Sequence, residues 1–375
     1  MVRSRLLFVS LMLIVALGGR SAAGEILIGT AAPLTGRLAW YGEQYQRAVE
    51  LALDEINESG GPLGRQVDLV LGDDACIDER GPALARSLVE RGVVAVIGHT
   101  CSGVAIAAAP IYEAAGIVMI SGSATNPALT EAGRPNVFRT VGRDDLQGKL
   151  AGDYLAEHHT HDRIAILFEE DVYVRGLAVE TRKRLHELGL EEALFLGFDD
   201  VRTFDWGGLV QRLTDERIDV IYFPARSPDV ALFVRYAAEA GERFDIIGGD
   251  SLHSEDFWLM AGAAGEGIIF TSVPDARTLP TAAHVVDRFR DAGYEPEGYT
   301  LYVYAALQAW AQAITQAGTF DPAAVMRVLR EADFETVLGT IGFDAKGDVT
   351  GYDPFTWYVW RNGDYVLLER AGMKE

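Results

Sequence analysis

Four residues that could do chemistry lie side by side at positions 99–102, where His99, Thr100, Cys101 and Ser102 follow the apolar run VVAVIG. An imidazole beside a thiol could form a nucleophile and its base, or supply two metal ligands. The cysteine could instead form a disulfide, and Ser102 could begin a helix whose first amides hold a small anion. A metal site needs more ligands, and the sequence contains no second His/Cys pair.

The first residues predict export from the cytoplasm. Arg3 and Arg5 precede an uncharged apolar run from Leu6 to Leu17, and small residues follow as far as Ala23. This pattern is typical of a cleaved signal peptide, here residues 1–23. The run is shorter than the ~20 residues that span a bilayer, and no cysteine follows it as a lipid anchor. We therefore expect a soluble protein outside the cytoplasm.

Cys76 and Cys101 are the only cysteines in the sequence. Because exported proteins meet an oxidising environment, two lone cysteines are expected to form a disulfide. The bond would close a loop of about 25 residues and add about 3 kcal/mol of stability. A nucleophilic Cys101 with His99 is the less favoured alternative.

Charge and missing motifs exclude several classes of function. The formal net charge is −22, and removal of residues 1–23 takes away three arginines and no acid, which gives −25 (−22 minus 3). Such a charge repels nucleic acid and anionic membrane surfaces. The sequence has no Gly-x-Gly-x-x-Gly after its first strand-like run, no P-loop, no Gly-x-Ser-x-Gly and no His-Glu-x-x-His. We therefore expect no cofactor and no metal.

Short apolar runs alternate with amphipathic stretches along the chain, which predicts parallel sheets covered by helices on both faces. The runs form two sets, one ending near Arg143 and one spanning about Asp144 to Ser272. A core helix is expected over 298–320, and an Asn-Gly turn at 362–363 predicts a late hairpin. The predicted strands are 25–31, 66–74, 93–98, 117–121, 163–170, 192–199, 219–225 and 244–250.

Ligands of open parallel sheets bind at the carboxyl ends of the strands. Hydroxyl groups and helix-start amides there would suit a carboxylate, and a lone acid with aromatic neighbours would suit an ammonium group. The sequence therefore predicts a site for a free zwitterion. Its candidate residues are Thr100, Ser102, Ser123, Thr125, Arg226 and Asp250 after the strands, with Tyr41, Tyr173 and Tyr299 as aromatic walls.

Several motifs, in order, resemble the leucine/isoleucine/valine-binding proteins, which are type I periplasmic solute-binding proteins of ABC transporters. They are DDAC at 73–76, GHTCS at 98–102, ISGSATNPALT at 120–130 and FDAKGDVTGYDPF near the end. The resemblance covers nearly the whole mature chain. It implies two Rossmann-like α/β lobes, 24–143 with 273–350 and 144–272 with 351–375, which are joined by a multi-crossover hinge and close over an amino acid.

The resemblance also implies roles for single residues. Cys76 and Cys101 would form the family's disulfide. The ligand carboxylate would be held by Ser102, Ser123 and Thr125, and the α-amino group by Asp250, where the family commonly has a glutamate. Tyr41, Tyr173 and Tyr299 would line the pocket.

Two residues depart from the family pattern. Arg226 stands where the leucine-binding branch has a tyrosine, and Thr100 replaces an apolar residue. A permanent cation is a poor neighbour for an aliphatic side chain unless it is paired, and Asp229 is a candidate partner. We therefore expect either a branched-chain amino acid or one with a polar or carboxylate side chain.

The function expected is a non-catalytic, monomeric receptor in the periplasm that delivers an amino acid to the permease subunits of an ABC transporter. A sensor of the same fold is the first alternative. An exported enzyme built on His99 and Ser102 is the second, although the sequence shows no evident acid to orient the histidine.

Overall fold

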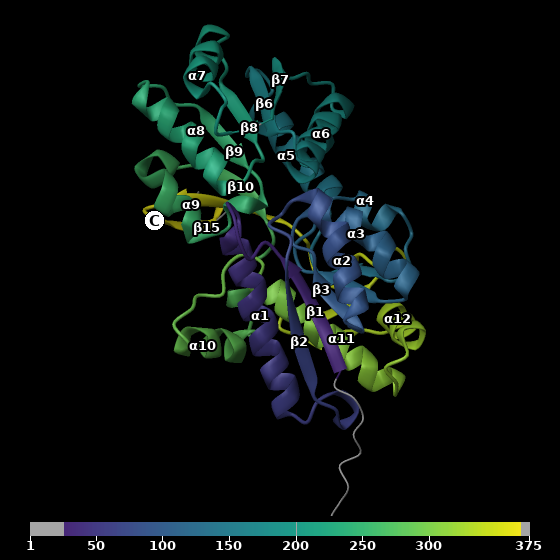
Figure 1. The fold of residues 1–375 in the computed structure, drawn as a ribbon. Helices are drawn as coiled ribbons and strands as arrows, with labels where there is room; N and C mark the ends of the chain where they lie inside the picture. Colours follow the sequence, from purple (N-terminus) through teal and green to yellow (C-terminus); the bar gives the residue numbers. More distant parts are fainter. Residues whose placement is uncertain (1–25, 200, 369–375) are drawn as a thin grey trace, which may run out of the picture.

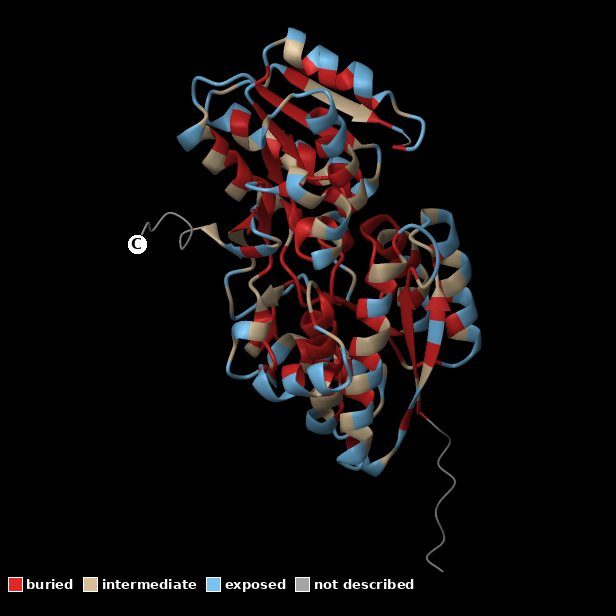
Figure 2. Cartoon of the chain, turned by 90° about the vertical axis from the view of Figure 1, so that its left-hand side faces the viewer, coloured by how far each residue is buried: buried red, intermediate tan, exposed pale blue. Residues whose placement is uncertain are grey.

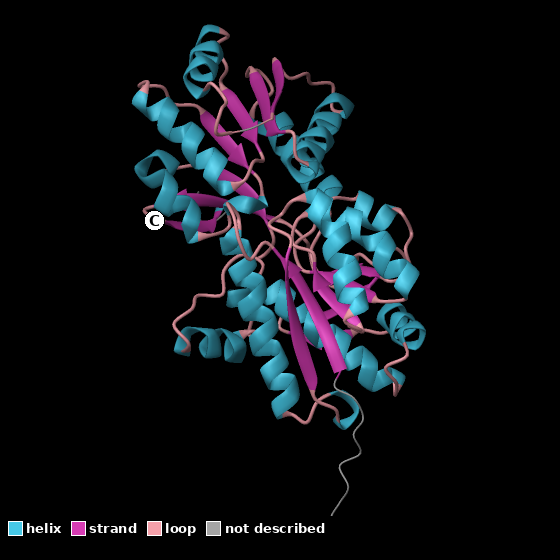
Figure 3. Ribbon diagram, viewed as in Figure 1, coloured by secondary structure: helices cyan, strands magenta, loops and turns pink. Residues whose placement is uncertain are grey.

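The computed structural model describes residues 26–199 and 201–368, which form two α/β lobes joined by a narrow waist (Figure 1, Figure 2). Buried residues lie mainly on the strands and on the inner faces of the helices (Figure 2). Helices flank both sheets, which confirms the predicted fold class (Figure 3). The predicted signal peptide lies outside the described residues.

The first lobe contains a five-stranded parallel sheet in the order β2-β1-β3-β4-β5. Successive side chains of a strand point to opposite faces. In β3, Ile97 therefore packs into the core with α1 and α11, whereas Val96 packs into a separate core with α2 and α3. The elements are β1 (Ile26–Ala32), α1 (Ala39–Glu58), η1 (Pro62–Gly64), β2 (Val67–Asp73), η2 (Asp78–Arg80), α2 (Gly81–Glu90), β3 (Ala95–Gly98), α3 (Ser102–Ala115), β4 (Val118–Ser121), α4 (Ala128–Glu131) and β5 (Val137–Arg139).

The predicted core helix is α11 (Thr300–Ala317), and it packs in the same core as α1. Its polar stripe binds a small antiparallel sheet that the sequence did not predict. Gln308 Oε1 accepts from the amide of Val337 at 2.9 Å, and Gln312 Nε2 donates to the carbonyl of Glu335 at 2.7 Å. The sheet consists of β11 (Phe334–Thr336), β12 (Gly339–Phe343) and β13 (Val349–Thr350), and α10 (Ala283–Asp291) and α12 (Pro322–Glu331) lie nearby in this lobe.

The second lobe contains a seven-stranded sheet in the order β15-β14-β10-β9-β8-β6-β7. Its five strands from residues 164–272 are parallel, and the late hairpin β14–β15 adds to β10 in antiparallel fashion. In Figure 1, α5 and α6 lie on one side of this sheet and α7, α8 and α9 on the other. The elements are α5 (Asp144–His158), β6 (Ile164–Glu169), α6 (Val172–Glu187), β7 (Leu194–Phe198), α7 (Trp206–Asp215), β8 (Val220–Phe223), α8 (Ser227–Glu239), β9 (Asp245–Gly248), η3 (Asp250–Leu252), α9 (Glu255–Ala261), η4 (Gly262–Gly265), β10 (Ile269–Ser272), η5 (Ala276–Thr278), β14 (Thr356–Arg361) and β15 (Asp364–Leu367).

Within the described residues, the chain passes between the two lobes over 140–143, 273–275 and 351–355. The first and third of these segments are in contact with each other. A Cβ added at Gly142 would lie 2.5 Å from the side chain of Pro354, and Tyr352 donates a hydrogen bond to the carbonyl of Thr140 at 2.6 Å. The lobe limits given above, at 143/144, 272/273 and 350/351, remain a prediction.

None of the helices in the described part of the chain is both long enough and apolar enough to cross a membrane.

Candidate functional site

A small cavity lies between the lobes, and seven of the nine predicted site residues line it. The volume open to water in this cavity is about 20 Å³, which is room for one or two waters. We call this space the central cavity. It is lined by Tyr41, Thr100, Cys101, Ser102, Ser123 and Tyr299 from the first lobe and by Tyr173 and Arg226 from the second.

The predicted disulfide is confirmed, and it lies at this cavity. Cys76 and Cys101 are bonded with their Cα atoms 5.6 Å apart, a normal separation for a disulfide. Cys101 adopts an extended conformation directly before α3. The bond therefore fixes the turn from β3 into α3, where Thr100 and Ser102 stand.

Hydroxyl groups form one wall of the cavity. Ser123 Oγ donates to the carbonyl of Thr100 at 2.8 Å and lies 2.8 Å from the hydroxyl of Tyr45. Ser102 Oγ accepts from the amide of Asn126 at 3.3 Å and stands at the first position of α3. A helix start presents free amide groups and a positive dipole end, so this wall favours an anion. Tyr45, on α1, was not predicted as part of the site.

The acid Asp250 lies behind the opposite side of the cavity. It follows β9 and is 2% exposed. The hydroxyls of Tyr173 and Tyr299, both of which line the cavity, donate to its two carboxylate oxygens. Burial raises the pKa of Asp250, and these two hydrogen bonds oppose the rise. Because Tyr299 and Asp250 belong to different lobes, this contact also joins the lobes.

Arg226 is buried in the cavity wall, and its partner differs from the expected one. Its Nη2 lies 3.0 Å from Asp171 Oδ2, and the guanidinium carbon lies 5.4 Å from the centre of the Tyr173 ring. Burial lowers the pKa of Arg226, but the charge of Asp171 and its hydrogen bond, together with Tyr41 and Glu169, outweigh this effect and raise the pKa overall. The prediction that Asp229 pairs with Arg226 is wrong, because the Asp229 side chain bonds to Arg37 instead.

Arg37 forms a bridge between the lobes. It precedes α1, and its Nη1 lies 2.5 Å from Asp229 Oδ1 on α8. Its Nη2 lies 3.2 Å from Glu169 Oε1 on β6. Asp229 is fully buried, and burial raises its pKa to about 7 against the lowering effect of Arg37. We call Arg37, Glu169 and Asp229 the lobe bridge.

Thr125 is the one predicted site residue of the first lobe that does not line the central cavity. It is 1% exposed, and its carbonyl accepts from the amide of Asp144 at 3.0 Å. Asp144, the first residue of α5, was not predicted to take part in the site. The rule that ligands bind at strand ends does not identify Asp144, because its position behind Thr125 depends on how α5 packs.

His99 is oriented by an acid, contrary to the expectation. Its Nδ1 lies 2.7 Å from Asp74 Oδ2, and its Nε2 lies 3.0 Å from the hydroxyl of Tyr112. All three side chains are buried. Because Tyr112 occupies the ring nitrogen that would serve a nucleophile, His99 is not arranged to activate Ser102. Within residues 26–199 and 201–368, no group of three or more His, Cys, Asp or Glu side chains could hold a metal ion.

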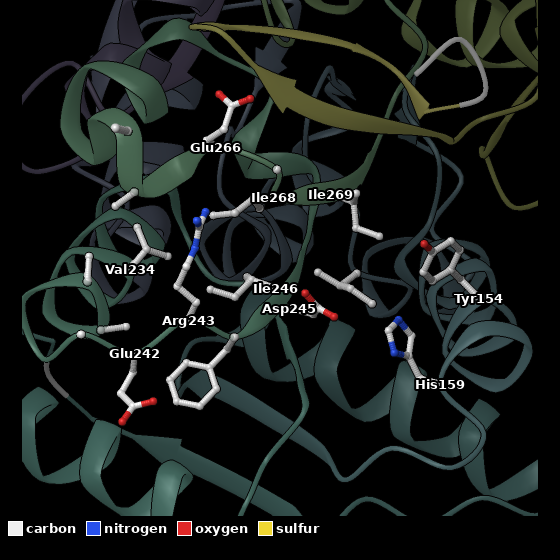
Figure 4. A pocket seen from close by; sticks show the side chains of 18 residues that line it. Tyr154, His159, Val234, Glu242, Arg243, Asp245, Ile246, Glu266, Ile268 and Ile269 are labelled. Atoms are coloured by element: carbon white, nitrogen blue, oxygen red, sulfur yellow. The ribbon is translucent and has the colours of Figure 1, made fainter. Parts of the chain in front are cut away.

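A larger hollow of about 950 Å³ lies elsewhere on the second lobe (Figure 4). It is found where β9 and β10 begin, at Asp245 and Ile269, whereas Asp250 follows the carboxyl end of β9. Its lining includes the apolar side chains of Ile246, Ile268 and Val234 and charged groups such as Arg243 (Figure 4). None of the predicted site residues lines it.

Comparisons with known proteins agree on one family. A family profile described as periplasmic binding protein matches residues 25–364. A relative from Brucella suis, named Leu/Ile/Val-binding protein homolog 1, is 40% identical over 365 residues, which cover 96% of this chain and 98% of the relative.

Solved structures are similar over the same length. The leucine binding protein LivK from Thermotoga maritima has a TM-score of 0.83 at 25% identity, covering 91% of this chain and 97% of that one. A substrate-binding protein of an ABC transporter from Desulfitobacterium hafniense, solved in complex with leucine, has a TM-score of 0.75 at 30% identity. That match covers 92% of this chain and 100% of the other.

Proposed function

Because the chain belongs to the periplasmic binding protein family, we propose that it is the substrate-binding component of an amino-acid ABC transporter in the periplasm. One observation carries the proposal: hydroxyl groups of one lobe and an aromatic and charged wall of the other meet in the central cavity. The relative from Brucella suis is named a Leu/Ile/Val-binding protein homolog, LivK is named a leucine binding protein, and the Desulfitobacterium hafniense protein was solved with leucine, which supports a branched-chain amino acid as ligand.

The two walls of the cavity suit the two charged ends of an amino acid. The carboxylate is held by the hydroxyl of Ser102 and the first amides of α3, with Ser123 and Thr125 beside it. The ammonium group replaces the phenolic hydroxyls as donor to Asp250, because a charged donor forms the stronger hydrogen bond to a carboxylate. Tyr41, Tyr173 and Tyr299 then cover the ligand and exclude water.

Movement of the lobes gives access to the site. The central cavity has room for one or two waters, so an amino acid requires the lobes to separate about the three crossing segments. Closure over the ligand brings Arg37 back toward Glu169 and Asp229, its partners in the lobe bridge. The closed form is the one that a permease recognises, and its population rises with the ligand's preference for it.

A second candidate for the ligand is an amino acid with a polar side chain, and two observations favour it. Arg226 lines the cavity, and Thr100 Oγ1 is buried there without a hydrogen-bond partner among the described residues. Because Asp171 already neutralises Arg226, a neutral polar side chain fits the charge balance better than a carboxylate.

The experiment that tests the function is a thermal-shift screen of all common amino acids, followed by calorimetry on those that raise the melting temperature. Binding of at least one amino acid at micromolar concentration or tighter is expected, and the mass of the released ligand should be unchanged. The proposal is rejected if no amino acid raises the melting temperature. Release of a chemically altered ligand would indicate an enzyme instead.

A further inference from the structure

The carboxyl group of Asp144 is unusual because it is fully buried and neither oxygen has a hydrogen-bond partner among the described residues. Its backbone amide donates to the carbonyl of Thr125, so the side chain stands directly behind the hydroxyl wall of the site. The Thr125 hydroxyl approaches the carboxyl group without forming a hydrogen bond of normal geometry. A buried carboxylate in such surroundings would be costly, so this group needs a proton or a nearby positive charge.

The cations near Asp144 are committed to other partners. Arg139, on β5, lies 2.7 Å from Asp348 Oδ1 and donates to the carbonyl of Ala124 at 2.8 Å. Arg143, directly before α5, pairs with Asp348 at 2.9 Å and with Asp145 at 2.9 Å. Asp145 adds a further negative charge beside Asp144. Arg139 lowers the pKa of Asp144, but this effect is smaller than the rise caused by burial and by Asp250.

The groups of the second lobe that face Asp144 are neutral or acidic. Tyr222, on β8, and Tyr173, on α6, are phenols whose pKa is raised mainly by burial. Gln147, one turn further along α5, has a side-chain oxygen without a partner among the described residues. Asp250 contributes the remaining charge, and burial first and the charge of Asp250 second raise the pKa of Asp144 well above its usual value.

Asp144 and Asp250 thus form a pair of buried acids that differ in their donors. Asp250 receives hydrogen bonds from Tyr173 and Tyr299, which stabilise its ionised form. Asp144 receives none from the described residues. Two carboxyl groups that interact in a dry site do not both ionise, and the one without donors keeps the proton.

We propose that Asp144 is a proton-releasing partner of the site: it carries a proton when no amino acid is bound and loses it when a ligand's ammonium group binds at Asp250. The inference rests on the function proposed above. In this step the O–H bond of Asp144 breaks, the proton passes to the solvent, and the ammonium charge of the ligand replaces it, while the first amides of α3 neutralise the ligand carboxylate. No electrons are transferred. This coupling favours ligands whose amine is protonated, because a neutral group bound at Asp250 would leave the proton on Asp144.

Calorimetry in two buffers tests this step. L-leucine, L-alanine and L-threonine are titrated at pH 7 in phosphate and in Tris, whose ionisation enthalpies differ widely. Release of one proton makes the binding enthalpies differ by the full difference between the buffers. The dissociation constant of wild type should also fall up to tenfold for each unit that the pH rises between 6 and 8, because a proton is a product of binding.

Two variants make the test specific. Asp144→Asn keeps the shape of the protonated acid but has no proton to release, so it should bind within tenfold of wild type and lose both the buffer effect and the pH effect. Asp153→Asn is the matched control on the same helix, because Asp153 pairs with Arg184 and Lys149 at the surface and should leave both effects intact.

The outcomes separate the two proposals. Binding with equal enthalpies in both buffers and no dependence on pH overturns the role of Asp144 alone. An unchanged proton count in Asp144→Asn also overturns it, because another group must then release the proton. If none of the amino acids binds, the proposed function fails and this inference fails with it. If Asp144→Asn does not fold, Asp144→Ser takes its place and should likewise lose the buffer effect and the pH effect.

Discussion

Each charge at the central cavity already has a partner within the protein. Arg226 is paired with Asp171, and Asp250 accepts from two tyrosines. A buried charge without such a partner would cost several kcal/mol. A ligand therefore gains affinity only where it forms a stronger contact than the one that it displaces. At Asp250, the ammonium group of the ligand replaces phenol hydroxyls as the hydrogen-bond donor, and this stronger contact favours binding.

The first prediction concerns Asp250. Asp250→Asn removes the negative charge that attracts the ammonium group, and we expect amino-acid affinity to fall at least tenfold because a buried ammonium then lacks its counter-charge. Isothermal titration calorimetry measures this change. Asp291→Asn, at the exposed end of α10, should bind as wild type does. Equal affinities in the two variants would remove Asp250 from the site.

The second prediction concerns Arg226. Arg226→Tyr introduces the residue of the leucine-binding branch, and we expect the ratio of leucine affinity to threonine affinity to rise about tenfold. The substitution leaves Asp171 without its cation, so Asp171→Asn is combined with it as a second variant. Competition binding with both amino acids gives the ratio. An unchanged ratio in both variants would mean that Arg226 does not face the ligand.

The sequence was sufficient to find residues at strand ends but not the residues behind them. Thr100, Ser102 and Ser123 follow β3 and β4, so the rule for parallel sheets located them. Tyr45, Asp144 and Asp74 stand on neighbouring elements. Their closeness to the site depends on how helices and loops pack, and no local pattern encodes that packing.

At the scale of elements, the disulfide connects the loop after β2 to the start of α3. Without it, two separate segments would be free to move at the wall where the ligand carboxylate is expected. The two cysteines are 25 residues apart in the sequence. Closing a loop of this length stabilises the folded protein by about 3 kcal/mol.

The third prediction follows from this bond. The double variant Cys76→Ala, Cys101→Ala should lose about 3 kcal/mol of unfolding free energy because its unfolded chain is less constrained. Urea denaturation gives the value, and wild type treated with a reducing agent is the control that should lose a similar amount. The prediction is contradicted if oxidised and reduced wild type unfold at the same urea concentration.

Long periodic elements were predictable, and short irregular ones were not. The strand-helix alternation located every strand of the parallel sheets except β5 and β10, which have three and four residues. The antiparallel sheet of β11, β12 and β13 was also overlooked because its strands of two to five residues show no lasting alternation. That sheet depends on contacts with the glutamines of α11, which a sequence pattern does not reveal.

At the scale of the whole molecule, the lobe bridge connects the lobes outside the central cavity. Arg37 reaches from the first lobe to a fully buried acid, Asp229, whose second carboxylate oxygen has no partner among the described residues. The bridge therefore makes the closed arrangement sensitive to the ionisation of Asp229.

The fourth prediction is a dependence of stability on pH. The folded-state pKa of Asp229 is about 7, above its unfolded value near 4, so the folded state holds a proton between these values that the unfolded state has lost. Stability due to Asp229 is therefore complete below pH 4 and is lost as the pH rises toward 7.

Asp229→Asn removes this titration. Relative to wild type, its unfolding free energy should rise by about 3 kcal/mol between pH 4.5 and pH 8, measured by urea denaturation. Asp245→Asn, an exposed acid at the start of β9, should show no such relative change. A constant difference between Asp229→Asn and wild type across this range would contradict the prediction.

The order of the strands in the second sheet differs from their order along the chain. β10 pairs with β14, but the polypeptide between them builds α11 and the antiparallel sheet of the other lobe. During synthesis, one edge of β10 stays unpaired until the hairpin emerges, and an open edge invites pairing with other nascent chains. Neither lobe can be completed before the other has largely been made, so both sheets depend on segments that are synthesised far apart in time.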